Sequence, residues 1–132
     1  METPSGYSIT PVVLFDDDSY AMNTAVTLSE TAANFSRLTI CYKSNEGDYS
    51  SVDVWHPDGK TVSLLTARTA GTTTPTFYLK SKTVLINGTT INTNSSASGG
   101  TTYYQTSQVR ADGSNSATRG DYIGITQVIG YR

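Results

Sequence analysis

Several features are scarce in this chain of 132 residues, and each scarcity excludes a class of protein. The single cysteine, Cys41, cannot form an internal disulfide, and its strand-like surroundings predict a small, buried or half-buried apolar side chain. Only 15% of the residues are charged, with nine basic and eleven acidic side chains and no basic cluster. Because nucleic-acid binding depends on several cationic contacts to phosphates, nucleic acid is not an expected partner.

Long hydrophobic runs are also missing. The longest of them, such as residues 12–15 and 84–86, fall far short of the roughly 20 apolar residues that a membrane helix needs. Residues 1–4 lack the basic and apolar regions of a signal peptide. We therefore expect no membrane insertion, and a single domain over 1–132 in which residues 1–11 are a flexible or linker-derived N-terminus.

Hydroxyl and aromatic side chains are abundant instead. The chain has 22 Thr, 16 Ser and nine Tyr, alongside many Val and Ile. β-Branched and aromatic side chains pack well on pleated strands. Turn signals divide the sequence into about eight to ten extended runs, which predicts an all-β fold, an antiparallel β-sandwich or β-barrel with under ~10% helix.

The middle of the chain shows the clearest alternation. Within residues 35–43, the apolar side chains share one face of a predicted strand: Leu38, Ile40 and Tyr42. The turn cluster 45–48 leads into a second alternating run, and the turn 56–60, with Pro57 and Gly59, leads into a third. We expect three consecutive antiparallel strands, at 35–43, 50–56 and 61–66.

The flanking regions follow the same logic. Asn87 and Gly88 predict a type I′ hairpin turn between the extended runs 83–86 and 89–92. Three further stretches are predicted to be loops: 69–75, 93–101 and 111–120. The last run, 122–131, is expected inside a sheet, with three isoleucines on one face: Ile123, Ile125 and Ile129.

Towards the N-terminus, the short extended runs 12–15 and 25–28 are predicted to be joined by a loop that contains Asp16, Asp17 and Asp18. Residues 28–35 could form one helical turn, with Ser29 as its cap. The three aspartates match no EF-hand spacing, which leaves a solvated acidic loop or calcium ligands as alternatives, and we assign no metal ligand.

The sequence offers no positive sign of catalysis. It has one histidine, His56, at the end of a predicted strand. Because the chain has 16 serines, a serine near His56 is expected by chance alone and does not indicate a catalytic triad. The eleven acidic residues are scattered, and nothing pairs two of them at glycosidase spacing. We therefore expect no enzyme activity, no catalytic residue and no cofactor.

Ligand binding has more support. Alternation predicts that Val52 and Val54 face inward on their strand, so Asp53 and Trp55 are expected to face outward. An exposed Trp beside an acid and His56 suits stacking on a sugar ring and hydrogen bonding to its hydroxyls. Three tyrosines are further candidates: Tyr49, Tyr103 and Tyr104. The alternative is that a second sheet or a neighbouring subunit covers Trp55.

Four ordered segments resemble the C-terminal domains of tail-fibre and receptor-binding proteins from siphophages of Gram-positive bacteria. They are VTLSETAANF at 26–35, LTICY at 38–42, SVDVWHPDGKTV at 51–62 and ITQVIGYR at 125–132. The last segment is similar to that family's ending, Ile-Thr-x-Val-Ile-Gly-Tyr followed by Lys or Arg. The resemblance spans roughly residues 12–92 and 122–132.

This resemblance implies a β-sandwich or β-barrel head at the distal tip of a trimeric tail protein, extracellular on the virion and attached to the rest of the phage tail or baseplate. It implies adhesion to saccharide of the host cell wall. A homotrimer interface is expected on the outward face that carries Trp55 or on the apolar face of the last strand. The alternatives are a secreted carbohydrate-binding module and a structural virion subunit that binds no ligand.

Overall fold

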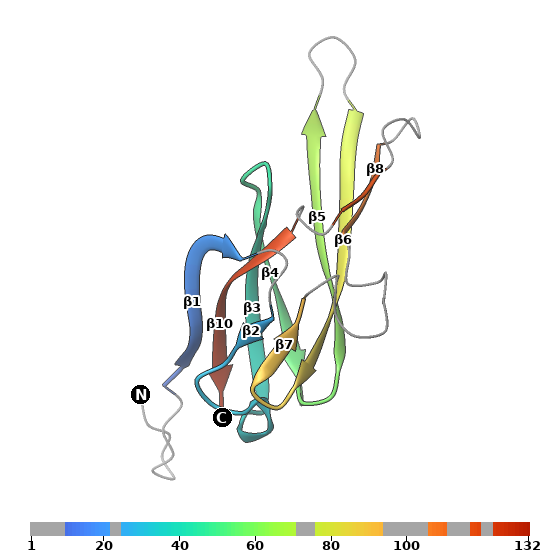
Figure 1. The fold of residues 1–132 in the computed structure, drawn as a ribbon. Coiled ribbons are helices and arrows are strands. Elements are labelled where there is room, and N and C mark those ends of the chain that lie inside the picture. The colour runs from blue at the N-terminus through green and yellow to red at the C-terminus, as the bar shows by residue number, and fades with distance from the viewer. Residues whose placement is uncertain (1–9, 22–24, 71–75, 94–105, 111–116, 120–122) are drawn as a thin grey trace.

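The computed structural model describes residues 10–21, 25–70, 76–93, 106–110, 117–119 and 123–132. This part of the chain contains ten β-strands and one 3₁₀ turn, and no α-helix. All strand pairs are antiparallel, and they form two sheets rather than one closed barrel (Figure 1). The predicted all-β class is confirmed, with the β-sandwich as its architecture.

The first sheet has four strands in the order β1-β10-β3-β4. Their bounds are Val12–Ala21 for β1, Ile123–Tyr131 for β10, Arg37–Ser44 for β3 and Tyr49–Trp55 for β4. As predicted, the last strand lies inside a sheet, between β1 and β3, and residues 37–55 form a hairpin.

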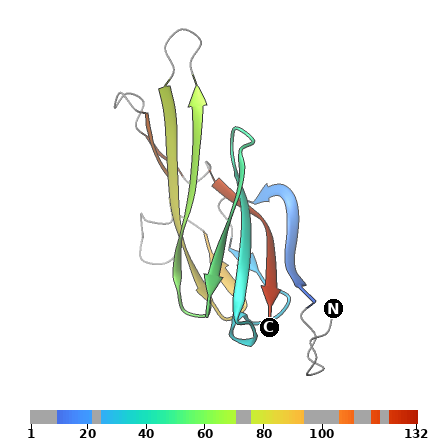
Figure 2. The same ribbon diagram turned by 180° about the vertical axis from the view of Figure 1, so that it is seen from behind.

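The second sheet is built around the long strand β6. Its six strands are β2 (Val26–Thr27), β5 (Thr61–Ala70), β6 (Thr76–Asn87), β7 (Thr90–Asn92), β8 (Thr106–Arg110) and β9 (Ala117–Arg119). β5 pairs along one edge of β6, while β7 and β8 share the other edge. The β5–β6 pair extends well beyond the end of the four-stranded sheet (Figures 1 and 2).

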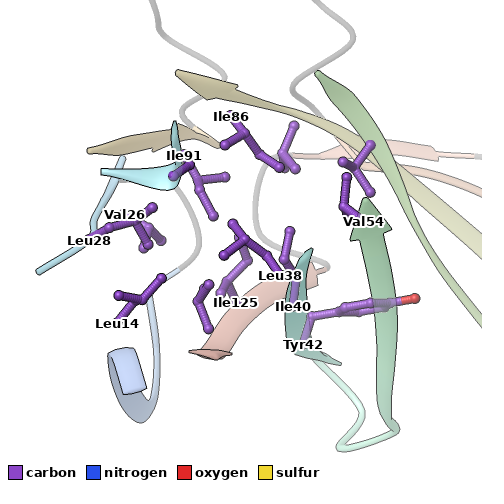
Figure 3. Close-up of a cluster of buried hydrophobic side chains, with 14 of the residues drawn as sticks. Leu14, Val26, Leu28, Leu38, Ile40, Tyr42, Val54, Ile86, Ile91 and Ile125 are labelled. Carbon is purple, nitrogen blue, oxygen red and sulfur yellow. The ribbon is translucent and has the colours of Figure 1, made fainter. Parts of the chain in front are cut away.

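The inward faces of the two sheets enclose a single apolar core (Figure 3). On β3 this face carries the side chains predicted from alternation: Leu38, Ile40 and Tyr42. The Tyr42 hydroxyl also reaches the second sheet, where it donates to the Leu65 carbonyl at 2.8 Å and accepts from the Leu65 N–H at 3.0 Å. One hydroxyl therefore satisfies two backbone groups of β5 that no described strand pairs.

The predicted row of three consecutive strands is wrong at its third member, because β5 belongs to the other sheet. After β4 the chain turns at His56, which has a positive φ of 49°, and at Gly59, with φ of 81°. The Gly59 N–H donates to the Ile86 carbonyl at 2.8 Å, and the Ile86 N–H donates to the Lys60 carbonyl at 2.9 Å. These bonds tie the connection to β6, so it crosses between the sheets.

The hairpin at Asn87 and Gly88 exists, but its turn is shifted by one residue from the prediction. Asn87 pairs with Thr90, which makes Gly88 and Thr89 the two central residues. Gly88 has a φ of 60°, whereas Thr89 is not among the residues with positive φ. A glycine alone in the first central position is the arrangement of a type II′ turn rather than type I′.

Four boundary predictions also need correction. The predicted acidic loop is a strand, because β1 continues through Asp16 and Asp18. The 3₁₀ turn Ala32–Asn34 is capped by Thr31, whose side chain accepts from the Ala33 N–H, and not by Ser29. The predicted loop 111–120 contains the strand β9. The predicted loop 69–75 begins two residues later, because β5 continues to Ala70. The predictions for residues 1–9, 71–75 and 94–101 lie outside the described residues.

A β-bulge in β10 overturns the predicted face of the last strand. Ile125 pairs with Tyr42 and Gln127 with Cys41, which leaves Thr126 as an extra residue. The alternation therefore changes phase: Ile123 and Ile125 are buried before the bulge, and Val128 is buried after it. Ile129 is half-buried and belongs to the opposite, outward set.

Gly130 supports the ring of Phe35. A Cβ atom at Gly130 would lie 2.6 Å from Phe35 Cδ1, and the ring is buried at 4% exposure. We therefore expect Gly130→Ala to lower the free energy of unfolding by about 1–3 kcal/mol, although alanine is otherwise acceptable in a strand. Urea unfolding measures this change. In a Phe35→Leu background the cost should shrink, and equal costs in both backgrounds would contradict the assigned contact.

Candidate functional site

The outer face of the four-stranded sheet, meaning its side turned away from the core, gathers exposed aromatic and polar side chains. Four cross-strand pairs of β3 and β4 form it: Arg37–Trp55, Thr39–Asp53, Cys41–Ser51 and Lys43–Tyr49. Trp55 is 59% exposed and Tyr49 is 62% exposed, at the two ends of β4. The predicted outward orientation of Asp53 and Trp55 is thus what the structure has, and neither a second sheet nor a described segment covers Trp55.

A shallow groove of about 390 Å³ lies at the Trp55 end of this face. We call it the Trp55 groove, and its lining residues are Ser36, Arg37, Trp55, Tyr131 and Arg132. The Arg37 guanidinium lies 4.1 Å from the centre of the Tyr131 ring and 5.3 Å from that of Trp55. The two aromatic rings therefore hold this cation in place through cation–π contacts.

Arg132, at the rim of the Trp55 groove, is already paired. Its two terminal nitrogens donate to Glu30 at 2.8 and 2.9 Å, and its guanidinium also lies over the Phe35 ring. Hydrogen bonds from Arg132 and then Asn34 hold the pKa of Glu30 below its ordinary value. This bidentate pair neutralises Arg132 and leaves Arg37 as the groove's uncompensated charge.

A second hollow, of about 520 Å³, lies at the other end of the outer face. We call it the Tyr49 cleft, and it is lined by Asp16, Asp18, Cys41, Tyr49, Ser50, Ser51, Thr126 and Gln127. The Tyr49 hydroxyl donates to Asp18 at 3.0 Å. Lys43 Nζ donates to the Asp18 backbone carbonyl at 2.8 Å and lies 3.6 Å from the Asp18 carboxylate.

These two hollows offer complementary chemistry. The Tyr49 cleft presents carboxylates, which accept strong hydrogen bonds from hydroxyl groups, together with an exposed ring. The Trp55 groove presents a ring and a fixed cation. Tyr49 and Trp55 are six residues apart on one strand, which corresponds to roughly 20 Å. The outer face can therefore contact an extended polar ligand at both ends.

Not every predicted site residue joins this face. His56 lines a different depression, with Phe35, Pro57 and Asp58, so the structure does not group it with Trp55. Asp53 lies on the face between the two hollows and accepts a hydrogen bond from the Thr39 hydroxyl at 2.7 Å. Tyr103 and Tyr104 lie outside the described residues.

Most residues that line the two hollows were not predicted as ligand contacts, among them Arg37, Tyr131, Asp16, Asp18 and Gln127. Alternation within 35–43 already placed Arg37 outward, so it could have been found. Gln127 and Tyr131 could not, because the bulge at Thr126 decides their direction. Asp17 does not line the Tyr49 cleft, and within the described ranges no three or more His, Cys, Asp or Glu side chains gather as a metal site.

Comparison with models of known protein families and with curated proteins gave no match for this chain. In the part of the chain that the structure describes, no helix is long and apolar enough to cross a membrane.

The Cys41 thiol, at the Tyr49 cleft, provides a chemical test of this geometry. Burial, and secondarily the negative charge of Asp53, raise its pKa above the ordinary value of 9.0. We expect Ellman's reagent at pH 8 to react several-fold more slowly with the folded protein than with the protein in urea, because little thiolate is present. The rate should rise as the pH passes 9, and Asp53→Asn should increase it at pH 8. Equal rates folded and unfolded would contradict the half-buried placement.

Proposed function

We propose that the outer face of the four-stranded sheet binds saccharide of a bacterial cell wall. The observation that carries this proposal is the pair of exposed aromatic side chains, Tyr49 and Trp55, each beside hydrogen-bonding groups in a hollow of the same face. Aromatic rings contact the C–H face of a sugar, and carboxylates discriminate the orientation of its hydroxyls.

The biological setting in this proposal is the tip of a phage tail. The chain acts there as an extracellular receptor-binding head domain that adheres to a Gram-positive host, as its resemblance in sequence implies. A shallow, solvent-open face binds one saccharide weakly, so adhesion needs several copies bound at once. A homotrimer supplies such copies, and the second sheet offers a surface for it.

The outward side of β5 and β6 carries no charged residue among the described positions. Large apolar side chains are exposed on this side of the second sheet: Leu65 at 49%, Phe77 at 46% and Val109, on β8, at 38%. The charges lie on the inward side, where Lys80 is buried and pairs with Glu46. A charge-free face can pack against its own copy without like-charge repulsion, which favours a second copy of this chain as its partner.

This surface replaces one of the two interfaces expected from the sequence. We favour the second sheet over the apolar face of the last strand, because Ile123, Ile125 and Val128 are buried in the core of the same chain. An interface on the second sheet also leaves the Trp55 groove, on the first sheet, open to ligand.

Trimer formation is tested by light scattering. We expect the parent protein to have three times the chain mass of 14.2 kDa, and Leu65→Glu to dissociate it, because a carboxylate would be buried at the interface. Val13→Glu is the matched control, since Val13 is 52% exposed on the first sheet. A monomeric parent would favour the secreted carbohydrate-binding module. If only Val13→Glu dissociates the trimer, the interface lies on the first sheet and the proposed interface on the second sheet is wrong.

Saccharide binding is tested by adsorption of the purified protein to a panel of Gram-positive cell walls. We expect Trp55→Ala and Tyr49→Ala each to weaken adsorption about tenfold, equivalent to ~1.4 kcal/mol for the loss of one stacking ring. His56→Asn, which keeps a residue that tolerates positive φ, should adsorb like the parent. Folding of each variant is checked by circular dichroism.

Other results of this experiment point elsewhere. Loss of adsorption only in Tyr103→Ala or Tyr104→Ala would refute the outer face as the binding site. A parent that adsorbs to no cell wall would favour a structural virion subunit without a ligand.

A further inference from the structure

Arg37 is a positively charged side chain that two aromatic rings hold in place, and it has no ion-pair partner among the described residues. Its Nε is buried and has no hydrogen-bond partner within the residues that the structure describes. No carboxylate in those same ranges forms an ion pair with its guanidinium. Two rings nevertheless fix it, at 4.1 and 5.3 Å from their centres. Burying part of a guanidinium without a counter-charge is unfavourable, so the buried position of Arg37 calls for an explanation.

The side chains that line the Trp55 groove around Arg37 carry no negative charge. None of its lining residues is acidic, and the other cation there, Arg132, is paired with Glu30. By contrast, the Tyr49 cleft at the far end of the same face has two aspartates among its lining residues, Asp16 and Asp18. Among the side chains that line the two hollows, the carboxylates therefore lie at the Tyr49 end and the guanidinium groups at the Trp55 end.

We propose that the Trp55 groove binds an acidic sugar unit, whose carboxylate or phosphate pairs with Arg37 while its ring stacks on Trp55. This inference rests on the proposed function and specifies the class of saccharide. The terminal nitrogens of a guanidinium form a fixed fork that matches two oxygens of either anion. Because Tyr131 and Trp55 already hold the side chain, little rotamer entropy is lost when the anion binds.

The polarity of the face also orients the ligand. Lys43 lies 3.6 Å from the Asp18 carboxylate and offsets its charge, so it is mainly Asp16 that disfavours an anionic group at the Tyr49 cleft. Neutral hydroxyls can donate to both carboxylates. A saccharide that spans the two hollows therefore places its acidic unit at Arg37 and a neutral unit at Tyr49.

The single tryptophan of the chain makes a direct test possible, because the indole N–H resonance of Trp55 reports on this groove alone. The probes are glucose, glucuronate, glucose 6-phosphate and inorganic phosphate, titrated into the parent protein. We expect glucuronate, glucose 6-phosphate or both to shift the resonance saturably at concentrations at least about tenfold lower than glucose. The two sugar acids distinguish a carboxylate from a phosphate as the natural group.

Variants then test the role of Arg37. Arg37→Gln should abolish the preference for the acidic sugars, and Arg37→Lys should keep part of it, because an ammonium retains the charge but not the planar fork. Lys43→Gln is the matched control, since Lys43 is a cation on the same strand and face but at the Tyr49 cleft. This control should leave the Trp55 titration unchanged.

The outcomes separate this inference from the proposed function. If neither acidic sugar binds more tightly than glucose, or if inorganic phosphate binds as tightly as glucose 6-phosphate, the inference is wrong even when cell walls are adsorbed. An unchanged preference in Arg37→Gln would also overturn it. If the parent adsorbs to no cell wall but glucuronate still shifts the Trp55 resonance, the proposed function fails and the anion site stands. The parent titrations decide the matter even if Arg37→Gln does not fold.

Discussion

The single extra residue in β10, Thr126, determines which way the second half of that strand faces. Strand side chains alternate with a period of two, so one inserted residue exchanges the two faces of everything beyond it. With the bulge, Val128 enters the core and Tyr131 points outward. Without it, Gln127 and Tyr131 would point into the core, and neither hollow of the outer face would have its present lining.

The bulge also explains why neighbouring residues at the end of β10 have different roles, one in the core and the next on the outer face. Gly130 faces inward and makes room for the Phe35 ring, while its neighbour Tyr131 faces outward and holds Arg37. The Tyr131 carbonyl accepts from both the N–H and the hydroxyl of Ser36. The core and the candidate binding groove are therefore built from alternate residues of one strand, and neither can change independently.

Local alternation was sufficient to predict the parts of the fold in which register is undisturbed. The inward and outward sets of β3 and β4, including Asp53 and Trp55, follow directly from residues 35–56. The sequence did not predict where the chain leaves one sheet for the other, because His56 to Lys60 resembles an ordinary hairpin turn and its bonds to Ile86 are long-range. The same limit applies to the site. Asp16 approaches Gln127, and Tyr131 approaches Arg37, only through long-range strand pairing that the local pattern does not encode.

The Tyr42 hydroxyl affects how readily two copies of this chain can pair through the open edge of β5. The edge of β5 is long and faces no strand among the described residues, and an open edge of this kind can recruit the strands of neighbouring molecules. At Leu65 both backbone groups on that edge are already occupied by a side chain from the opposite sheet. An incoming strand would first have to break two hydrogen bonds that are anchored in the core. Many copies can thus be displayed side by side with less risk of merging into a continuous, insoluble sheet.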